Sequence, residues 1–124
     1  MVVGLTDREL LEEAAAAAVC AYAPYSNFPV GAAALLRDGR IMTGVNVENA
    51  SFTVGVCAER AALARAVAEG AKPGDVEAVA TTSTPCGACR QWFVEFGIDR
   101  IVYRSDGELV SRRPDDALPD SFRF

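Results

Sequence analysis

Three cysteines and one glutamate lie in two short segments whose spacing suits a metal site. The first segment is Cys57-Ala58-Glu59-Arg60, and the second is Pro85-Cys86-Gly87-Ala88-Cys89-Arg90-Gln91. Zn²⁺ prefers soft sulfur ligands in a four-coordinate, tetrahedral arrangement. Three protein ligands leave the fourth position open to water, and the only other cysteine, Cys20, lies far upstream. The sequence therefore predicts one Zn²⁺ per chain in an open, catalytic type of site, held by Cys57, Cys86 and Cys89.

The charged residues beside these cysteines suggest what the site does. Glu59 follows Cys57 too closely to be a comfortable fourth ligand, but near a zinc-bound water it can act as a general acid and base. Three thiolates and one Zn²⁺ carry a formal charge of about −1, which weakens the metal as a Lewis acid. Arg60 and Arg90 are adjacent to this charge, and we favour Arg60 as a donor to a ligand sulfur that tunes the metal.

The overall composition excludes several classes of function. The chain has 124 residues, is 51% hydrophobic and carries a net charge of −5. This length is about that of one ordinary domain, so we expect residues 1–124 to form a single domain. An acidic chain without a basic run is a poor candidate for binding nucleic acid or an anionic membrane. The chain contains no histidine, so a Ser-His-Asp triad and a Cys-His dyad are excluded.

The cysteines and the longest apolar stretch indicate the cellular location of the protein. No signal-peptide pattern precedes the cysteines, and a C-x-x-C pair in such a chain is more typical of metal binding than of disulfides. The longest apolar stretch, residues 14–23, is too short to span a membrane. We therefore expect a cytoplasmic protein.

Periodicity and turn signals predict alternating helices and strands. Thr6 and Glu9 form a capping box that begins a helix running to about Tyr22, with Cys20 as a small buried core residue in it. The cysteine segments begin two further helices, 57–69 and 86–96, whose N-termini favour thiolates. Strands are expected at 30–36, 41–47, 76–82, 100–104 and 108–112, followed by a polar tail. The turn after residue 104 is so short that the last two strands must be antiparallel.

The end of the second strand carries two polar residues at alternate positions, Asn46 and Glu48. Alternate residues of a strand point to the same face. Spacing alone leaves two interpretations equally open, a solvated strand end and a pair of ligand-binding side chains.

Four ordered motifs give the chain a resemblance to the cytidine deaminases of the homotetrameric, zinc-dependent type. They are residues 25–33 (Tyr-Ser-Asn-Phe-Pro-Val-Gly-Ala-Ala), residues 46–51 (Asn-Val-Glu-Asn-Ala-Ser) and the two cysteine segments, and residues 117–122 resemble the end motif of the family. The resemblance covers nearly the whole chain. It implies a three-layer α/β/α domain with a five-stranded mixed sheet whose last two strands are antiparallel.

The resemblance also implies an activity and a set of roles. The zinc-dependent reaction is hydrolytic deamination of cytidine and 2'-deoxycytidine, in which hydroxide attacks C4 of the pyrimidine and Glu59 shuttles protons. Asn46 and Glu48 would hydrogen-bond the ribose, Phe28 would line the pyrimidine pocket, and the Ala58 backbone N–H and carbonyls of residues 83–85 would read the base edge. Phe122 would reach the ring from a neighbouring subunit, so the implied partner is a second copy of the chain in a homotetramer with shared active sites.

Two rival functions stay open at this stage. One is a deaminase of a modified cytosine nucleoside, such as a blasticidin-type antibiotic. Residues 46–48 disfavour it because they suit a ribose, whereas the short segment before Pro85 keeps it open. The other rival is a non-catalytic, zinc-stapled binding protein, which Glu59 beside an open metal position disfavours. The resemblance also disfavours a polynucleotide substrate, because polynucleotide deaminases of the same superfamily have a parallel crossover in place of the short antiparallel connection near the C-terminus and usually a histidine ligand.

Overall fold

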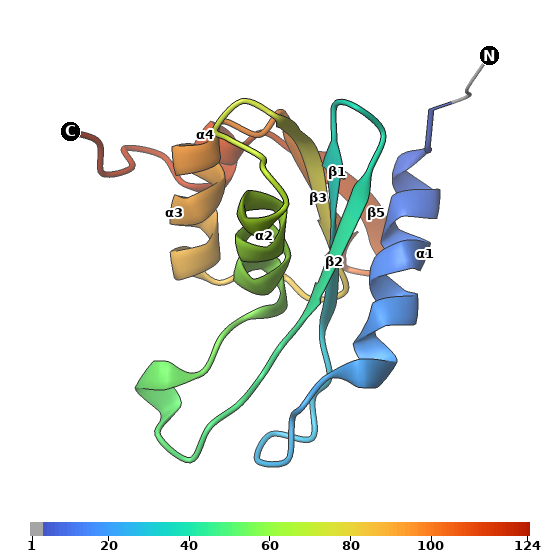
Figure 1. Cartoon of the computed structure of the whole chain (residues 1–124), viewed down its shortest axis with the longest axis vertical. Helices are drawn as coiled ribbons and strands as arrows, with labels where there is room; N and C mark the ends of the chain where they lie inside the picture. Colours follow the sequence, from blue (N-terminus) through green and yellow to red (C-terminus); the bar gives the residue numbers. More distant parts are fainter. Residues whose placement is uncertain (1–3) are drawn as a thin grey trace.

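The computed structural model describes residues 4–124 and places one mixed sheet between two layers of helices (Figure 1). The five strands lie in the order β2-β1-β3-β4-β5. Their bounds are Gly31–Leu36 for β1, Ile41–Val45 for β2, Val76–Thr81 for β3, Arg100–Ser105 for β4 and Glu108–Arg112 for β5. The predicted three-layer architecture with a five-stranded mixed sheet is confirmed.

The strand pairing explains why the sheet is mixed. β1 pairs antiparallel with both β2 and β3, β3 pairs parallel with β4, and β4 pairs antiparallel with β5. The parallel pair needs a crossover, which α3 (Gly87–Phe96) supplies. The turn between β4 and β5 has positive φ at both Asp106 (52°) and Gly107 (80°), which is the backbone of a tight hairpin. The predicted antiparallel arrangement of the last two strands is therefore confirmed.

The helices cover opposite faces of this sheet and create two buried clusters. α1 (Asp7–Ala17) lies on one face, while α2 (Ala58–Ala68) and α3 lie on the other (Figure 1). The cluster under α1 contains Leu10, Leu11, Ala14, Leu35 and Val102. The larger cluster under α2 and α3 contains Leu63, Val79, Phe93, Ile101 and Tyr103. Burial of apolar area on both faces fixes the register of the central strands.

Two glycines let helices approach the sheet closely. A Cβ on Gly31 would stand 1.9 Å from the Ala14 carbonyl oxygen of α1. A Cβ on Gly44 would stand 2.3 Å from the Ala62 nitrogen and 2.6 Å from the Ala58 oxygen, both in the backbone of α2. Both distances are far below van der Waals contact, so these positions require glycine. The start of α2, which carries Glu59, is thereby held directly against β2.

Helix α1 begins as predicted but ends earlier. The Thr6 hydroxyl accepts from the Glu9 N–H over 3.1 Å, and Glu9 accepts from the Thr6 N–H over 3.0 Å, which completes the capping box. The α-helix ends at Ala17 and becomes a 3₁₀ turn, η1 (Ala18–Cys20). The change of helix type turns Cys20 outwards, so this side chain is exposed. The prediction of Cys20 as a buried core residue was therefore wrong.

Two further elements differ from the prediction. β2 ends at Val45 rather than at residue 47, because Val47 leaves the sheet and bridges to Tyr22 and Val56 instead. In the tail, Pro114–Ala117 forms a short helix, α4, with proline in its first turn. A third short segment, η2 (Phe52–Val54), lies in the loop after β2. Within residues 4–124, no helix has the length and apolar character needed to cross a membrane.

Candidate active site

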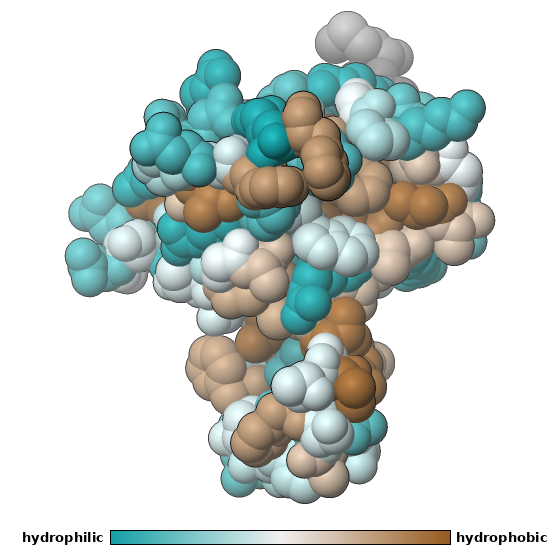
Figure 2. Space-filling view, turned by 90° about the vertical axis from the view of Figure 1, so that its left-hand side faces the viewer, coloured by the Kyte–Doolittle hydropathy of each residue, from teal (hydrophilic) through white to brown (hydrophobic). Residues whose placement is uncertain are grey.

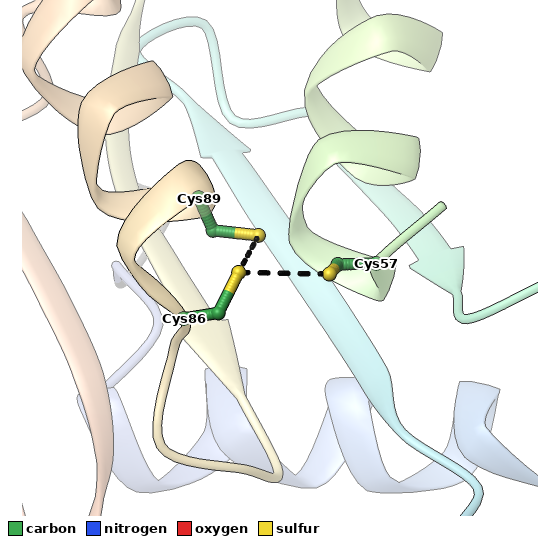
Figure 3. A group of neighbouring side chains, drawn as sticks. All are labelled: Cys57, Cys86 and Cys89. Carbon is green, nitrogen blue, oxygen red and sulfur yellow. Dashed lines mark hydrogen bonds between the residues drawn. The ribbon is translucent and has the colours of Figure 1, made fainter. Parts of the chain in front are cut away.

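The three predicted ligands meet at the N-termini of two helices (Figure 3). Cys57 is the N-cap of α2, Cys86 is the N-cap of α3, and Cys89 lies in the first turn of α3. The Cys57 and Cys86 sulfurs are 3.7 Å apart, and those of Cys86 and Cys89 are 3.5 Å apart. Sulfurs at tetrahedral positions about 2.3 Å from Zn²⁺ would be separated by about 3.8 Å. The described geometry therefore fits a zinc ion.

The local backbone leaves these sulfurs free for a metal. Both N-cap residues are extended, with φ and ψ of −77° and 152° at Cys57 and of −74° and 169° at Cys86. Neither side chain caps its own helix. The free N–H groups and the dipoles at both helix ends favour negative charge at this point.

The thiols of α3 have different acidities in the absence of a cation. Burial opposes ionisation of Cys86, but hydrogen bonds from the backbone and side chain of Cys89 outweigh it and lower the pKa of Cys86. Burial raises the pKa of Cys89, and the nearby charges of Glu59 and Cys57 raise it further. Three thiolates and a carboxylate crowded together repel one another, so the cluster is built to hold a divalent cation.

Glu59 lies beside the sulfurs with little access to solvent. It is in the first turn of α2, and only 4% of the residue is exposed. Burial raises the pKa of its carboxyl group, although its own backbone N–H, Cys89 and Arg60 act in the opposite direction. A buried carboxyl with a raised pKa is suited to exchange protons near neutral pH.

The two candidate arginines have different contacts. Arg60 Nη2 donates to the Cys57 sulfur over 3.3 Å, and this contact is the main reason why the pKa of Arg60 is raised. Its Nε is buried without a hydrogen-bond partner in residues 4–124. Arg90 instead donates to two backbone carbonyls, those of Pro85 and Ala117, each over 2.9 Å. The geometry thus places Arg60, and not Arg90, against a ligand sulfur.

A hollow of about 420 Å³ opens in front of the cysteines and Glu59. Its volume is that of a small-molecule site. Its walls come from the loop before β1 and the loop after β2, at the bottom of Figure 1, from Ser83 and Thr84 after β3, and from the starts of α2 and α3. Five of the residues predicted to contact substrate or its proton line this hollow: Phe28, Asn46, Glu48, Ala58 and Glu59.

Asn46 also holds the loop that precedes β1. Its Oδ1 accepts from the Val30 N–H over 2.8 Å, and its Nδ2 donates to the Phe28 carbonyl over 3.0 Å. One N–H of the amide is then left over for a ligand. Asn46 therefore shapes the wall of the hollow that Phe28 forms.

Glu48 binds the same loop a few residues earlier. Its carboxylate accepts from the backbone N–H groups of Tyr25, over 2.9 Å, and Ser26, over 3.1 Å, and from the Ser26 hydroxyl. The hydroxyl contact is the main cause of the lowered pKa of Glu48, which burial opposes. A carboxylate offers about four acceptor positions, so about one is left for a ligand.

Comparison with known proteins agrees with this geometry. Residues 5–105 match the model of the "Cytidine and deoxycytidylate deaminase zinc-binding region". A cytidine deaminase of Halalkalibacterium halodurans is 42% identical over 126 residues, which cover 94% of each chain. A probable cytidine deaminase of Dictyostelium discoideum is 48% identical over 100 residues, which cover 77% of this chain and 63% of that protein. The crystal structure of cytidine deaminase from Burkholderia pseudomallei superposes with a TM-score of 0.88, at 44% identity, over 95% of this chain and 100% of that one.

This chain belongs to the cytidine deaminase family. The family match covers all three cysteines, and the sulfurs lie within 4.8 Å of one another. Cys57, Cys86 and Cys89 thus form the zinc site of this family member, as the sequence predicted.

Phe122 is the one predicted substrate contact that lies away from the site of its own chain. The residue is 68% exposed, and its ring packs edge-on against Phe124. Its carbonyl accepts from Gln91 Nε2 over 2.9 Å, which places it on the outer side of α3. In this cytidine deaminase-family chain, Phe122 does not line the hollow in front of its own Glu59.

Two residues that line the site, Phe52 and Ser26, were not singled out by sequence reasoning. Phe52 lines the hollow while 82% exposed, but nothing in the local pattern marks it. Ser26 binds Glu48, and its hydroxyl also accepts from the Phe28 N–H over 3.0 Å. The signal for Ser26 was present, because Ser and Asn between two prolines are typical of a turn closed by side chains.

Proposed function

We propose that the protein catalyses the hydrolytic deamination of cytidine and 2'-deoxycytidine to uridine and 2'-deoxyuridine, with release of ammonia. One observation carries this proposal. The buried carboxyl of Glu59 stands beside three sulfurs arranged for a tetrahedral metal, at the inner end of a hollow of about 420 Å³. When bound, zinc supplies Lewis-acid activation of water at this position.

Glu59 and Arg60 have different roles in the reaction. Glu59 takes a proton from the attacking water and delivers it to N3 of the pyrimidine. It then takes the proton of the new hydroxyl group at C4 and passes it to the amine, so the C4 carbonyl forms as ammonia leaves. The raised pKa of Glu59 suits both directions of transfer. Arg60 neutralises part of the charge of the three thiolates through its bond to Cys57. Without this cation, the excess negative charge would oppose formation of the attacking hydroxide.

Binding groups surround the two halves of the nucleoside. The Ala58 N–H is among the first N–H groups of α2 and has no partner within the helix, so it donates to the base. Phe28 covers the ring from the loop that Asn46 holds. Asn46 and Glu48 use their remaining donor and acceptor positions for ribose hydroxyls.

The further parts of the proposal concern the oligomeric state, the cellular location and the pathway. We propose a homotetramer in which Phe122 completes the site of a neighbour, because its ring is exposed and does not line the hollow in front of its own Glu59. A largely apolar groove on α2 and α3 offers a surface for a second copy, and its lining comprises Ala64, Val67, Trp92 and Phe96 together with the polar Gln91 and Glu95. Residues 1–124 act as one cytoplasmic domain in pyrimidine salvage, with a free nucleoside and no polynucleotide as substrate.

The decisive experiment is a spectrophotometric deamination assay combined with metal analysis. Cytidine and 2'-deoxycytidine should be turned over, and free cytosine should be a very poor substrate because it lacks the ribose that Asn46 and Glu48 bind. Comparable turnover of cytosine and cytidine would refute the ribose contacts. Preferred turnover of a blasticidin-type nucleoside in the same assay would favour a deaminase of modified cytosine nucleosides. A zinc-loaded protein without any deaminase activity would favour a non-catalytic, zinc-stapled binding protein.

A further inference from the structure

Arg90 joins two parts of the chain that are far apart in sequence. Its Nε donates to the Pro85 carbonyl and its Nη1 to the Ala117 carbonyl, each over 2.9 Å. The second of these bonds spans 27 residues. No carboxylate in residues 4–124 forms an ion pair with Arg90. Within residues 4–124, both hydrogen bonds of the Arg90 guanidinium therefore go to backbone carbonyls.

A hydrogen-bond donor to either carbonyl has a structural effect. The Pro85 carbonyl belongs to the peptide that leads into the zinc ligand Cys86, so holding it fixes the approach of that ligand to the metal. Ala117 is the last residue of α4, and the final carbonyls of a helix have no partner within it. Arginine can satisfy two such acceptors at once because its donors form a rigid planar fork.

The next residue along α3 binds the tail a second time. Gln91 Nε2 donates to the Phe122 carbonyl over 2.9 Å. Between these two attachments the chain turns, and Asp120 has a positive φ of 54°. Residues 118–121 are therefore held at both ends by neighbouring side chains of the helix that carries Cys89. This α3 side of the molecule, with its apolar residues interrupting a hydrophilic surface, faces the viewer in Figure 2.

The other contacts of the tail are weaker restraints. Arg123 and Asp115 form an ion pair of 2.8 Å, but their side chains are 58% and 61% exposed, and exposed pairs add little stability. The Phe122 ring contacts Phe124, which is itself fully exposed. Backbone attachment, and not packing of the ring, sets where Phe122 lies.

We infer that Arg90 is a positioning residue that couples the zinc-binding loop to the C-terminal tail, and that Gln91 positions the tail alone. Only the expected effect on KM for cytidine rests on the proposed function, in which Phe122 completes a neighbouring site. The expected effects on zinc retention and on the order of the tail do not depend on the substrate.

The experiment compares Arg90→Ala with Gln91→Ala, with Arg90→Lys as the conservative variant and exposed Arg112→Ala as the matched control. Each zinc-loaded protein is measured in three ways. These are the rate of zinc release to a chelator, the hydrogen exchange of residues 118–124, and kcat and KM for cytidine.

Arg90→Ala should release zinc about ten-fold faster, because groups just outside the ligands typically change metal affinity by about this factor or more. In this variant, the amides of the tail should exchange hydrogen faster than in the wild type. KM for cytidine should rise about three- to ten-fold, as expected for a lost hydrogen bond. Gln91→Ala should show the tail and KM effects with unchanged zinc release. Arg90→Lys should recover part of the loss because it keeps the charge and reaches one carbonyl, and Arg112→Ala should match the wild type.

The inference is overturned if Arg90→Ala releases zinc at the wild-type rate, or if Gln91→Ala accelerates release equally. It is also overturned if tail exchange is unchanged in both. If the proposed function is wrong, the result is different. Neither the wild type nor any variant then acts on cytidine, but the rates of zinc release and hydrogen exchange still distinguish Arg90→Ala from Gln91→Ala. Should Arg90→Ala not fold, Arg90→Lys and Gln91→Ala provide the same contrast.

Discussion

At the level of single residues, the three ligands have different neighbours although they share one metal. Cys57 receives a hydrogen bond from Arg60, while Cys89 is fully buried next to Glu59. Cys86 lies between the other two sulfurs and is exposed. One thiolate is thus stabilised by a cation, whereas another is destabilised by its surroundings until the metal is present. The site gains its charge balance from Arg60 and zinc together.

The zinc content of cysteine variants tests this assignment. Wild type and Cys20→Ser should both contain one zinc per chain, because Cys20 is exposed on η1 and takes no part in the cluster. Cys89→Ser should lose most of the zinc, because it removes one of three ligands. Metal analysis of purified protein gives the ratio directly. Zinc near zero in the wild type, or a clear drop in Cys20→Ser, would contradict the assignment.

Glu59→Gln isolates the proton-transfer role. Glutamine keeps the shape of the side chain but cannot carry the proton. General acid–base catalysis contributes roughly a hundred- to ten-thousand-fold, and one group serves several transfers here, so we expect a loss at the upper end or beyond. Zinc should stay bound, which metal analysis checks. A variant that retains a tenth of the wild-type turnover would argue against the role.

At the level of elements, β2 and α2 form a rigid pair that holds the site. The backbone of α2 approaches Gly44 so closely that no side chain fits between them. β2 is followed by Asn46, and α2 follows its N-cap Cys57, so two walls of the hollow start from this contact.

Gly44→Ala should therefore destabilise the protein and the site together. The new Cβ would lie 2.3 Å from the Ala62 nitrogen, and helix backbone cannot move aside as a flexible side chain can. Overpacking typically costs about 1–3 kcal/mol, and we expect the upper part of this range in urea unfolding. Gly4→Ala is the control, because nothing lies within 4 Å of a Cβ at that exposed position. Equal stability of the two variants would show that α2 moves away from β2 easily.

The loop before β1 should respond to pH through Glu48. Its pKa is lowered in the folded protein, first by the Ser26 hydroxyl. The stabilisation is therefore present above the unfolded pKa of about 4.3 and is lost as the pH falls through the lower folded value. The melting temperature of wild type should exceed that of Glu48→Gln at neutral pH, and the gap should close in this acidic window. A gap that widens as the pH falls would contradict the interpretation.

Local signals in the sequence were enough to predict most elements. The capping box, the glycine after each of the two cysteine-led helices and the Asp-Gly turns are short-range features, and each lies where the structure needs it. The end of α1 has no such signal, since an alanine-rich run continues to Pro24. Close packing of α1 on Gly31 accompanies the change of helix type at Ala18. That contact depends on the tertiary structure and is not encoded locally.

The zinc ligands were predictable because their chemistry and spacing are visible in the chain. The acceptors of Arg90 were not, since both of them are backbone carbonyls, which any residue could supply. The loop-holding roles of Asn46 and Glu48 were missed for a similar reason, because all of their partners except the Ser26 hydroxyl are backbone N–H and C=O groups. Sequence patterns indicate side-chain chemistry well and backbone partners poorly.

At the level of the whole molecule, the exposed apolar residues are concentrated near the tail and the loops of the hollow. Phe124 is fully exposed, and Phe52 and Phe122 are 82% and 68% exposed. Brown patches are visible both on the α3 side and on the narrower lower lobe, which contains the loops around the hollow (Figure 2). An unburied phenylalanine forgoes roughly 1.5–3 kcal/mol of burial, so three of them favour association of copies.

If Phe122 completes a neighbour's site, defects in different chains should complement each other. Phe122→Ala should lower activity strongly, and Glu59→Gln should abolish it. Unfolding and refolding the two variants together would produce mixed oligomers, in which some sites combine an intact Glu59 from one chain with an intact Phe122 from the next. The measured activity should then rise above the sum of the separately refolded variants. Refolding each variant with itself is the control, and mass spectrometry of the native assemblies checks the mixing. Because both groups would have to come from one chain if Phe122 acted within its own subunit, demonstrably mixed oligomers without recovered activity, or a fully active monomer in solution scattering, would exclude the shared site.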